Sequence, residues 1–159
     1  MTTSSVLRDQ LQIAKDDRVL VFGIGNDGRQ DDGIGIHLFT ALEQRMWPSG
    51  WGLDADYQLN AEVALQISEY QVVLFLDASR KQIDSPFYLE EIVPDERVSF
   101  STHAMSAASV LGLCVRLYAV QPRCYWIGVP GESWGYGVGL SDRAEYNVRQ
   151  LLMEFDSLL

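Results

Sequence analysis

Three residues in this sequence have the side-chain types of a hydrolytic or metal-binding site: Asp32, Asp77 and His103. Two carboxylates and one imidazole provide oxygen and nitrogen ligands without a soft thiolate, a mixed set that suits zinc, nickel, iron or manganese. Three protein ligands leave room on an ion for water or substrate, and a carboxylate can also act as a general base. The three residues are far apart in the chain, so the elements that carry them must bring them together.

Asp32 and its neighbour Asp31 lie in the segment GIGNDGRQDDGIG, residues 23–35, which follows an apolar run at 19–22. The segment contains G-x-G-x-x-G, and in dinucleotide-binding domains such glycines cradle a pyrophosphate at a helix N-terminus. Two adjacent carboxylates would repel a phosphate here, and Arg29 offsets only one of the charges. Asp31 taken alone is best interpreted as a helix-capping aspartate, whereas Asp32 stays ambiguous until partners are found.

Asp77 and His103 are the candidate partners of Asp32. Asp77 directly follows a very apolar strand, where an acid is costly unless it is paired, hydrogen-bonded or bound to a cation, although capping of the next loop also explains it. His103 stands at the start of a predicted helix that Ser101 or Thr102 can cap. The helix dipole would keep this imidazole neutral and able to bind metal, whereas a lone histidine there is otherwise a surface or capping residue.

The other reactive side chains fit structural roles. His37 lies on the apolar face of a predicted helix. Cys114 and Cys124 lack the spacing of metal-binding cysteines, and we interpret them as small buried thiols. Trp134 and Tyr136 stand among glycines in a late loop. They either grip a partner protein or pack locally.

Strands alternate with helices along the chain. We predict strands at 18–23, 54–59 and 72–76, an edge strand at 87–93 and a strand at 124–129, with helices at 34–42, 62–68, 104–118 and 141–158 and a short helix or arm within 1–16. This order predicts one α/β domain over residues 1–159, a three-layer sandwich in which helices cover both faces of a mainly parallel twisted sheet. Function then belongs at the carboxyl ends of the strands.

The composition narrows the range of partners. The chain has 159 residues, 47% of them hydrophobic, and a formal net charge of -10. Such a charge disfavours attraction to nucleic acid or to an anionic membrane. The polar start lacks the apolar core of a signal peptide and no apolar run is long enough to span a bilayer, so we expect a cytoplasmic protein.

Several segments resemble the hydrogenase maturation proteases. GIGNDGRQDDGIG resembles the family's glycine-asparagine segment followed by two acids, and VVLFLDAS resembles its apolar strand that ends in aspartate-alanine. STHAMSAASVLGLCVRLY is similar to its serine-x-histidine segment, and GESWGYGVGLSDRAE to its late glycine-rich loop. The resemblance covers residues 18–158.

The resemblance implies a fold, a site and an activity. The family's metal-contacting residues fall on Asp32, Asp77 and His103, with Asp32 and Asp77 as the catalytic carboxylates. Family members clip a C-terminal extension from the large-subunit precursor of a nickel-iron hydrogenase once nickel is inserted. The nickel is thus carried by the substrate protein, although zinc or cadmium fits the same ligands in the isolated enzyme, which we expect to be monomeric.

The sequence also departs from the family's pattern. YQLNAEVALQI replaces an acidic, glycine-rich stretch that helps to define the substrate site in many members, which leaves the substrate unassigned. Asp32 stands where glutamate is common and is one methylene shorter. Two alternatives remain: a non-catalytic nickel-binding chaperone for the same large subunit, and a dinucleotide-binding module.

Overall fold

The computed structural model describes residues 5–97 and 104–159, so His103, Ser101 and Thr102 lie outside the described residues. Five strands form one sheet in the order β2-β1-β3-β5-β4, in which only the β4–β5 pair is antiparallel. The strands are β1 (Val19–Ile24), β2 (Gly52–Asp56), β3 (Val72–Ser79), β4 (Tyr88–Glu91) and β5 (Arg123–Pro130). The predicted fold class, a mainly parallel α/β sheet, is confirmed.

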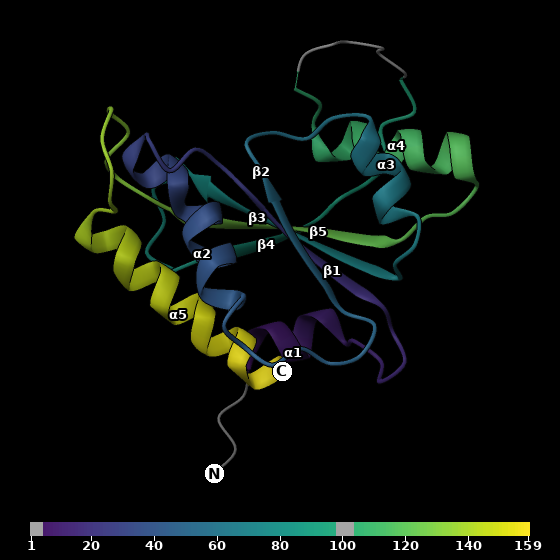
Figure 1. Cartoon of the computed structure of the whole chain (residues 1–159), viewed down its shortest axis with the longest axis horizontal. Coiled ribbons are helices and arrows are strands. Elements are labelled where there is room, and N and C mark those ends of the chain that lie inside the picture. Colours follow the sequence, from purple (N-terminus) through teal and green to yellow (C-terminus); the bar gives the residue numbers. More distant parts are fainter. Residues whose placement is uncertain (1–4, 98–103) are drawn as a thin grey trace.

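Helices cover both faces of this sheet (Figure 1). One face carries α1 (Val6–Leu11), α2 (Ile34–Leu42) and α5 (Asp142–Leu158), and the other carries α3 (Glu62–Ile67) and α4 (Ala107–Tyr118). Successive residues of β1 enter opposite cores: Val19 and Val21 face α2 and α5, whereas Leu20 and Phe22 face α3 and α4. Burial on both faces explains the unbroken apolar run of this strand. Among the described residues, none of the helices has the length and apolar character that a membrane crossing requires.

The N-terminal segment is a docked helix, which decides between the helix and the arm predicted for residues 1–16. Leu7 and Leu11 of α1 are 0% exposed in the core that they share with α5. The Ser5 hydroxyl caps α1 by accepting a hydrogen bond from the Arg8 amide, and it donates to Glu154 of α5 over 2.7 Å. The start of the chain therefore packs against its end.

Several predicted element boundaries are wrong. β3 continues to Ser79 beyond the predicted end at 76, and β4 covers Tyr88–Glu91 and not 87–93. β2 covers Gly52–Asp56 and not 54–59, because the chain leaves the sheet after Asp56. The helix predicted from 104 begins at Ala107, because Ser106 has an extended backbone (φ -72°, ψ 158°) and cannot lie inside the helix. The N-cap of α4 is Ser106, whose hydroxyl accepts from the Ser109 amide over 3.1 Å. The predicted capping by Ser101 or Thr102 is wrong because Ser106 is the N-cap, and the prediction for His103 lies outside the described residues.

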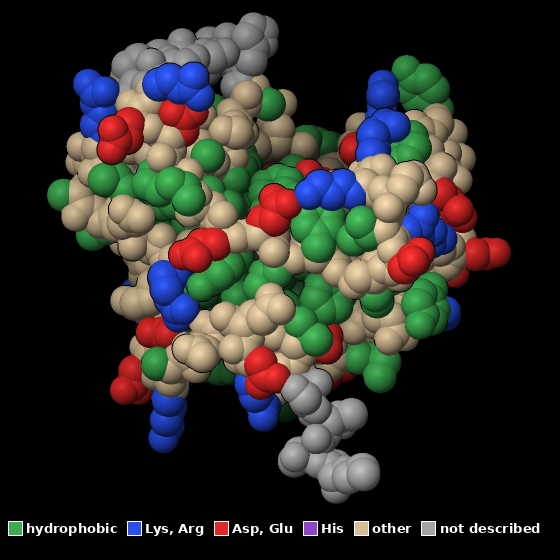
Figure 2. Space-filling model, turned by 180° about the vertical axis from the view of Figure 1, so that it is seen from behind, with side chains coloured by type: hydrophobic (Ala, Val, Ile, Leu, Met, Phe, Trp, Pro, Cys, Tyr) green, Lys and Arg blue, Asp and Glu red, His purple; other side chains and the backbone are tan. Residues whose placement is uncertain are grey.

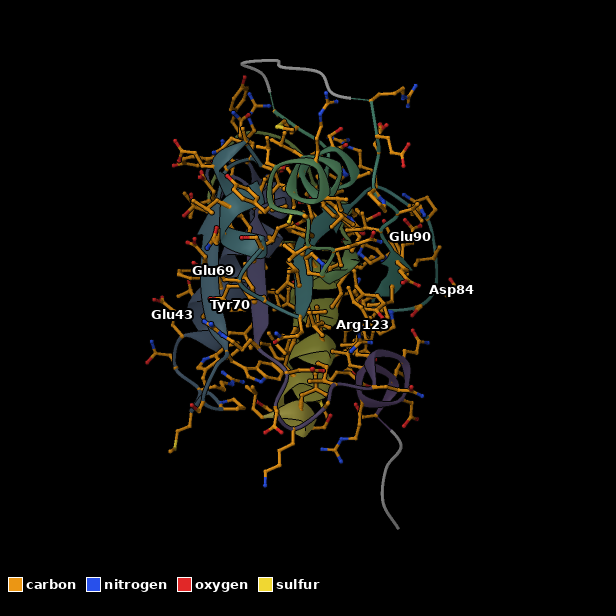
Figure 3. All side chains as sticks on the ribbon, turned by 90° about the vertical axis from the view of Figure 1, so that its right-hand side faces the viewer. Glu43, Glu69, Tyr70, Asp84, Glu90 and Arg123 are labelled. Atoms are coloured by element: carbon orange, nitrogen blue, oxygen red, sulfur yellow. The ribbon has the colours of Figure 1, made fainter. Side chains whose placement is uncertain are left out.

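Charged side chains lie on both lateral sides of the molecule, including the β4 edge of the sheet. Glu90 of β4 and Glu69 beyond α3 lie on opposite sides of the molecule in Figure 3. Glu90 pairs with Lys81 over 2.7 Å at the β4 edge. Charges on an edge strand discourage pairing with another chain, and β4 is the predicted edge strand, shortened to four residues.

Candidate active site

The parallel sheet brings Asp32 and Asp77 to the same end of the molecule. β1 and β3 are parallel neighbours, with Gly23 in register with Leu76. Asp77 is the next residue of β3, and Asp32 lies in the 3-10 helix η1 (Gln30–Gly33), which follows β1 and contacts β3. Both carboxylates thus lie at the carboxyl ends of central strands, the usual position of a site in an open α/β sheet.

The glycines of the 23–35 segment allow close backbone packing. A Cβ on Gly25 would lie 2.1 Å from the Asp32 carbonyl oxygen, and a Cβ on Gly35 would lie 2.1 Å from the Ile24 carbonyl oxygen. The Asn26 amide donates to the same Asp32 carbonyl over 3.1 Å. Only glycine permits this approach, so the segment presses η1 and α2 onto the end of β1 and fixes the backbone of Asp32.

Asp31 is a structural anchor, and its predicted role as a helix cap is wrong. Its side chain is 0% exposed and accepts four hydrogen bonds from the loop at 131–141. The donors are the amides of Glu132, Ser133 and Ser141, over 2.7, 2.9 and 2.8 Å, and the Ser141 hydroxyl, over 2.6 Å. Burial acts to raise the pKa of Asp31, but these hydrogen bonds outweigh it and lower the pKa below 3.8. Asp31 stays ionised and ties the two loops together.

Asp77 has a different electrostatic environment. Burial raises its pKa from 3.8 to about 7, a hydrogen bond from the Ala78 amide acts to lower it, and the charge of Asp32 raises it further. The charge of Asp32 affects Asp77 because the two carboxylates share one site. A carboxylate with a pKa near neutrality can accept a proton from water and return it, as a general base must.

A cavity of about 560 Å³ opens beside Asp77. It lies between β3, β4 and the start of α4, and its apolar walls include Ile24, Leu59, Ile92, Met105 and Trp126. Lys81, Glu90 and Glu91 are among its charged lining residues. A cavity of this size with apolar walls and a few polar groups can bury a short segment of peptide next to the carboxylate.

The structure places two of the three predicted metal ligands together. Within residues 5–97 and 104–159, no three His, Cys, Asp or Glu side chains are grouped as a metal site would need. The third predicted ligand, His103, is not among these residues. Asp32 and Asp77 provide carboxylate oxygens, which are suitable ligands for a divalent cation.

The two cysteines cannot serve as nucleophiles. Cys114 and Cys124 are buried and free, as predicted. Burial and the neighbouring Cys114 raise the pKa of the Cys124 thiol to about 12, and burial also raises that of Cys114. A thiol must ionise to attack, so both groups are inert at neutral pH. His37 is half-buried on α2, consistent with a structural role.

Two arginines lie beside the site: from the sequence, Arg29 was considered only as a charge that offsets one carboxylate, and Arg80 was missed. The Arg29 guanidinium lies 4.6 Å from the ring centroid of Tyr136, and that of Arg80 lies 4.4 Å from the ring of Trp134. Arg29 also donates to the Tyr136 hydroxyl over 3.1 Å. The available signal was their position, since Arg29 precedes Asp32 by three residues and Arg80 follows Asp77 by three.

Solved structures with this fold include named hydrogenase maturation endopeptidases. The hydrogenase-maturating endopeptidase HybD from E. coli is 24% identical with a TM-score of 0.69, over 87% of this chain and 89% of that one. The [NiFe] hydrogenase maturation protease HycI from Thermococcus kodakarensis KOD1 is 19% identical with a TM-score of 0.67, over 87% and 91%. An endopeptidase from Escherichia coli is 25% identical with a TM-score of 0.64, over 88% and 93%. No family model and no curated protein matches the sequence.

Proposed function

We propose that this chain, which has the fold of the hydrogenase maturation endopeptidases, is a peptide hydrolase that processes the large subunit of a nickel-iron hydrogenase. It removes a C-terminal extension after nickel has been inserted. The observation that carries this proposal is the pair Asp32 and Asp77, held at the carboxyl ends of two central strands in that fold. The cavity beside Asp77 supports it, because a peptide can reach the carboxylate there.

In this proposal, Asp32 and Asp77 recognise the nickel that the substrate carries, and His103 is the third ligand that the resemblance implies. Two carboxylates that share one site repel each other, and a divalent cation removes that repulsion. A precursor without nickel lacks this attraction and therefore binds less well. Recognition of the cargo thus couples cleavage to metal insertion.

Hydrolysis needs one water molecule and one base. A carboxylate of the pair takes a proton from the water as the water oxygen bonds to the scissile carbonyl carbon. The carbon–nitrogen bond then breaks, and the proton passes from the carboxylic acid to the departing amine. The subunit keeps the new carboxylate, and the extension leaves with the new amino group.

The direct test compares a large subunit that carries its extension and nickel with the same subunit lacking nickel. Each is incubated with the purified protein, and its C-terminus is followed by mass spectrometry. We expect loss of the extension only from the nickel-loaded subunit. Equal cleavage of both forms would contradict the gating by nickel. Tight binding without cleavage would contradict the protease and favour the nickel-binding chaperone.

Substitutions at the pair test the assigned residues. Asp32→Asn and Asp77→Asn remove a charge without changing side-chain shape and should each abolish processing, as should His103→Ala. Asp27→Asn is the matched control, because Asp27 is exposed on the same loop as Asp32. Processing by Asp32→Asn or Asp77→Asn at the wild-type rate would refute the role given to that residue.

A further inference from the structure

Five side chains form a rim beside the carboxylate pair: Arg29, Arg80, Trp134, Tyr136 and Val138. Each of the two arginines stacks on one aromatic ring. Two of the rim residues are strongly exposed to solvent, Tyr136 at 84% and Val138 at 90%. The loop that carries Trp134, Tyr136 and Val138 projects beyond the body of the molecule (Figure 1). Seen from behind, basic and hydrophobic side chains gather on this projection, next to a hollow in the surface (Figure 2).

The rim is held in place by its backbone. The Gln30 amide donates to the Gly137 carbonyl, and the Gly137 amide donates to the Gly28 carbonyl, both over 3.0 Å. The Gly135 amide donates to the Gln30 side chain over 2.8 Å, and the four bonds to Asp31 fix the rest of the loop. Surfaces ordered in advance lose less conformational entropy when they bind a partner.

The rim arginines are free to bind carboxylates. The acidic residues outnumber lysine and arginine by 22 to 12, yet the ion pairs within residues 5–97 and 104–159 include neither Arg29 nor Arg80. Each guanidinium stacks one face on a ring, which leaves N–H groups at its edge. Such a planar edge matches a carboxylate and can donate two hydrogen bonds to it.

We propose that the rim docks the folded body of the substrate protein through acidic side chains on that protein. The proposal rests on the proposed function and extends it. No rim residue lines the cavity beside Asp77, so a peptide bound in the cavity does not account for the rim. A folded protein that presents its extension to Asp77 is large enough to cover both. Arginine, tryptophan and tyrosine are also the residues that contribute most binding energy in protein interfaces.

The test measures kcat and KM for cleavage of the nickel-loaded, extended large subunit by the variant Arg29→Gln/Arg80→Gln. We expect KM to rise about tenfold while kcat at saturation stays unchanged, because docking is lost but the carboxylate pair is not. The wild-type KM should also rise more steeply with added salt than that of the variant. The control, Arg116→Gln/Arg149→Gln, loses the same charge from exposed positions on α4 and α5 and should keep the wild-type KM.

The outcomes separate this proposal from the proposed function. A wild-type KM in the rim variant would overturn the rim proposal, and so would a fall in kcat at constant KM. Failure of the wild-type protein to cleave the loaded subunit would refute the protease instead. In that case, affinity for the same subunit, measured by surface plasmon resonance, still tests the rim: equal affinity of wild type and variant overturns it.

Discussion

Asp31 and Asp32 are adjacent in the chain, but their carboxylates do different work. The structure gives Asp31 four donors and no exposure, whereas Asp32 is half-buried and electrostatically coupled to Asp77. Its hydrogen bonds lower the pKa of Asp31, whereas burial and the charge of Asp32 raise the pKa of Asp77. One aspartate thus holds two loops of the site together, and we propose that the next one acts in the site.

Replacement of Asp31 should destabilise the protein. Asp31→Ala leaves three amides and a hydroxyl without their acceptor, and we expect the free energy of unfolding to fall by about 2–4 kcal/mol at neutral pH. Because the pKa of Asp31 is lowered on folding, this contribution is present above its ordinary pKa of 3.8 and lost as the pH falls below it. Urea unfolding of Asp31→Ala and of the exposed control Asp27→Ala measures the difference, and equal stabilities would contradict the anchor.

We expect the ionised form of Asp77 to lower the stability of the folded protein. Its pKa of about 7 means that the folded protein holds a proton between pH 3.8 and 7 that the unfolded chain has released, so stability falls as the pH rises through that range. Asp77→Asn has no charge to bury, and its amide oxygen can still accept from Ala78. In metal-free buffer at about pH 8 we expect the variant to be more stable than wild type by up to about 4 kcal/mol, with little difference at about pH 4. Thermal unfolding at both pH values checks this, and a variant less stable at pH 8 would contradict the raised pKa.

Two serine N-caps differ in the groups to which their hydroxyls are hydrogen-bonded. Among the described residues, the Ser106 hydroxyl bonds only to Ser109 in the first turn of α4, whereas Ser141 caps α5 through the Ala144 amide and also donates to Asp31. Ser106→Ala should cost about 1 kcal/mol, the ordinary value of a cap, and Ser141→Ala should cost about twice that. Chemical denaturation of the two variants provides the comparison, in which a smaller cost at Ser141 would refute the double role.

Elements that are buried on both faces could be predicted from sequence, and those at the edges less well. The apolar run at 72–76 marks β3 and places Asp77 at its end, and parallel pairing then brings Asp77 near Asp32. The start of α4 could not be predicted, because Ser101, Thr102 and Ser106 are all suitable N-cap residues and the sequence alone does not distinguish between them. The anchoring of Asp31 is equally non-local, since its donors lie about a hundred residues further along the chain.

On the scale of the whole molecule, the two ends of the chain stabilise each other at a distance from the site. α1 packs Leu7 and Leu11 against α5, and Glu154 of α5 accepts from the Leu7 amide over 3.1 Å. Leu11→Ala should lower the free energy of unfolding by about 2–5 kcal/mol, because the cavity left behind cannot fill. kcat for the loaded subunit should stay unchanged below the melting temperature. Differential scanning calorimetry gives the first quantity, and a melting temperature equal to that of wild type would contradict the packing.

The hydrogen bonds that Asp31 accepts from the 131–141 loop couple two distant segments of the chain, so neither segment can change independently of the other. A change in the late loop that displaces Ser141 leaves a buried charge at Asp31 without partners, and loss of Asp31 frees the loop. A grafted late loop whose backbone follows a different path should therefore leave Asp31 without donors and destabilise the chimera, unless residues 26–33 are transplanted together with 131–141.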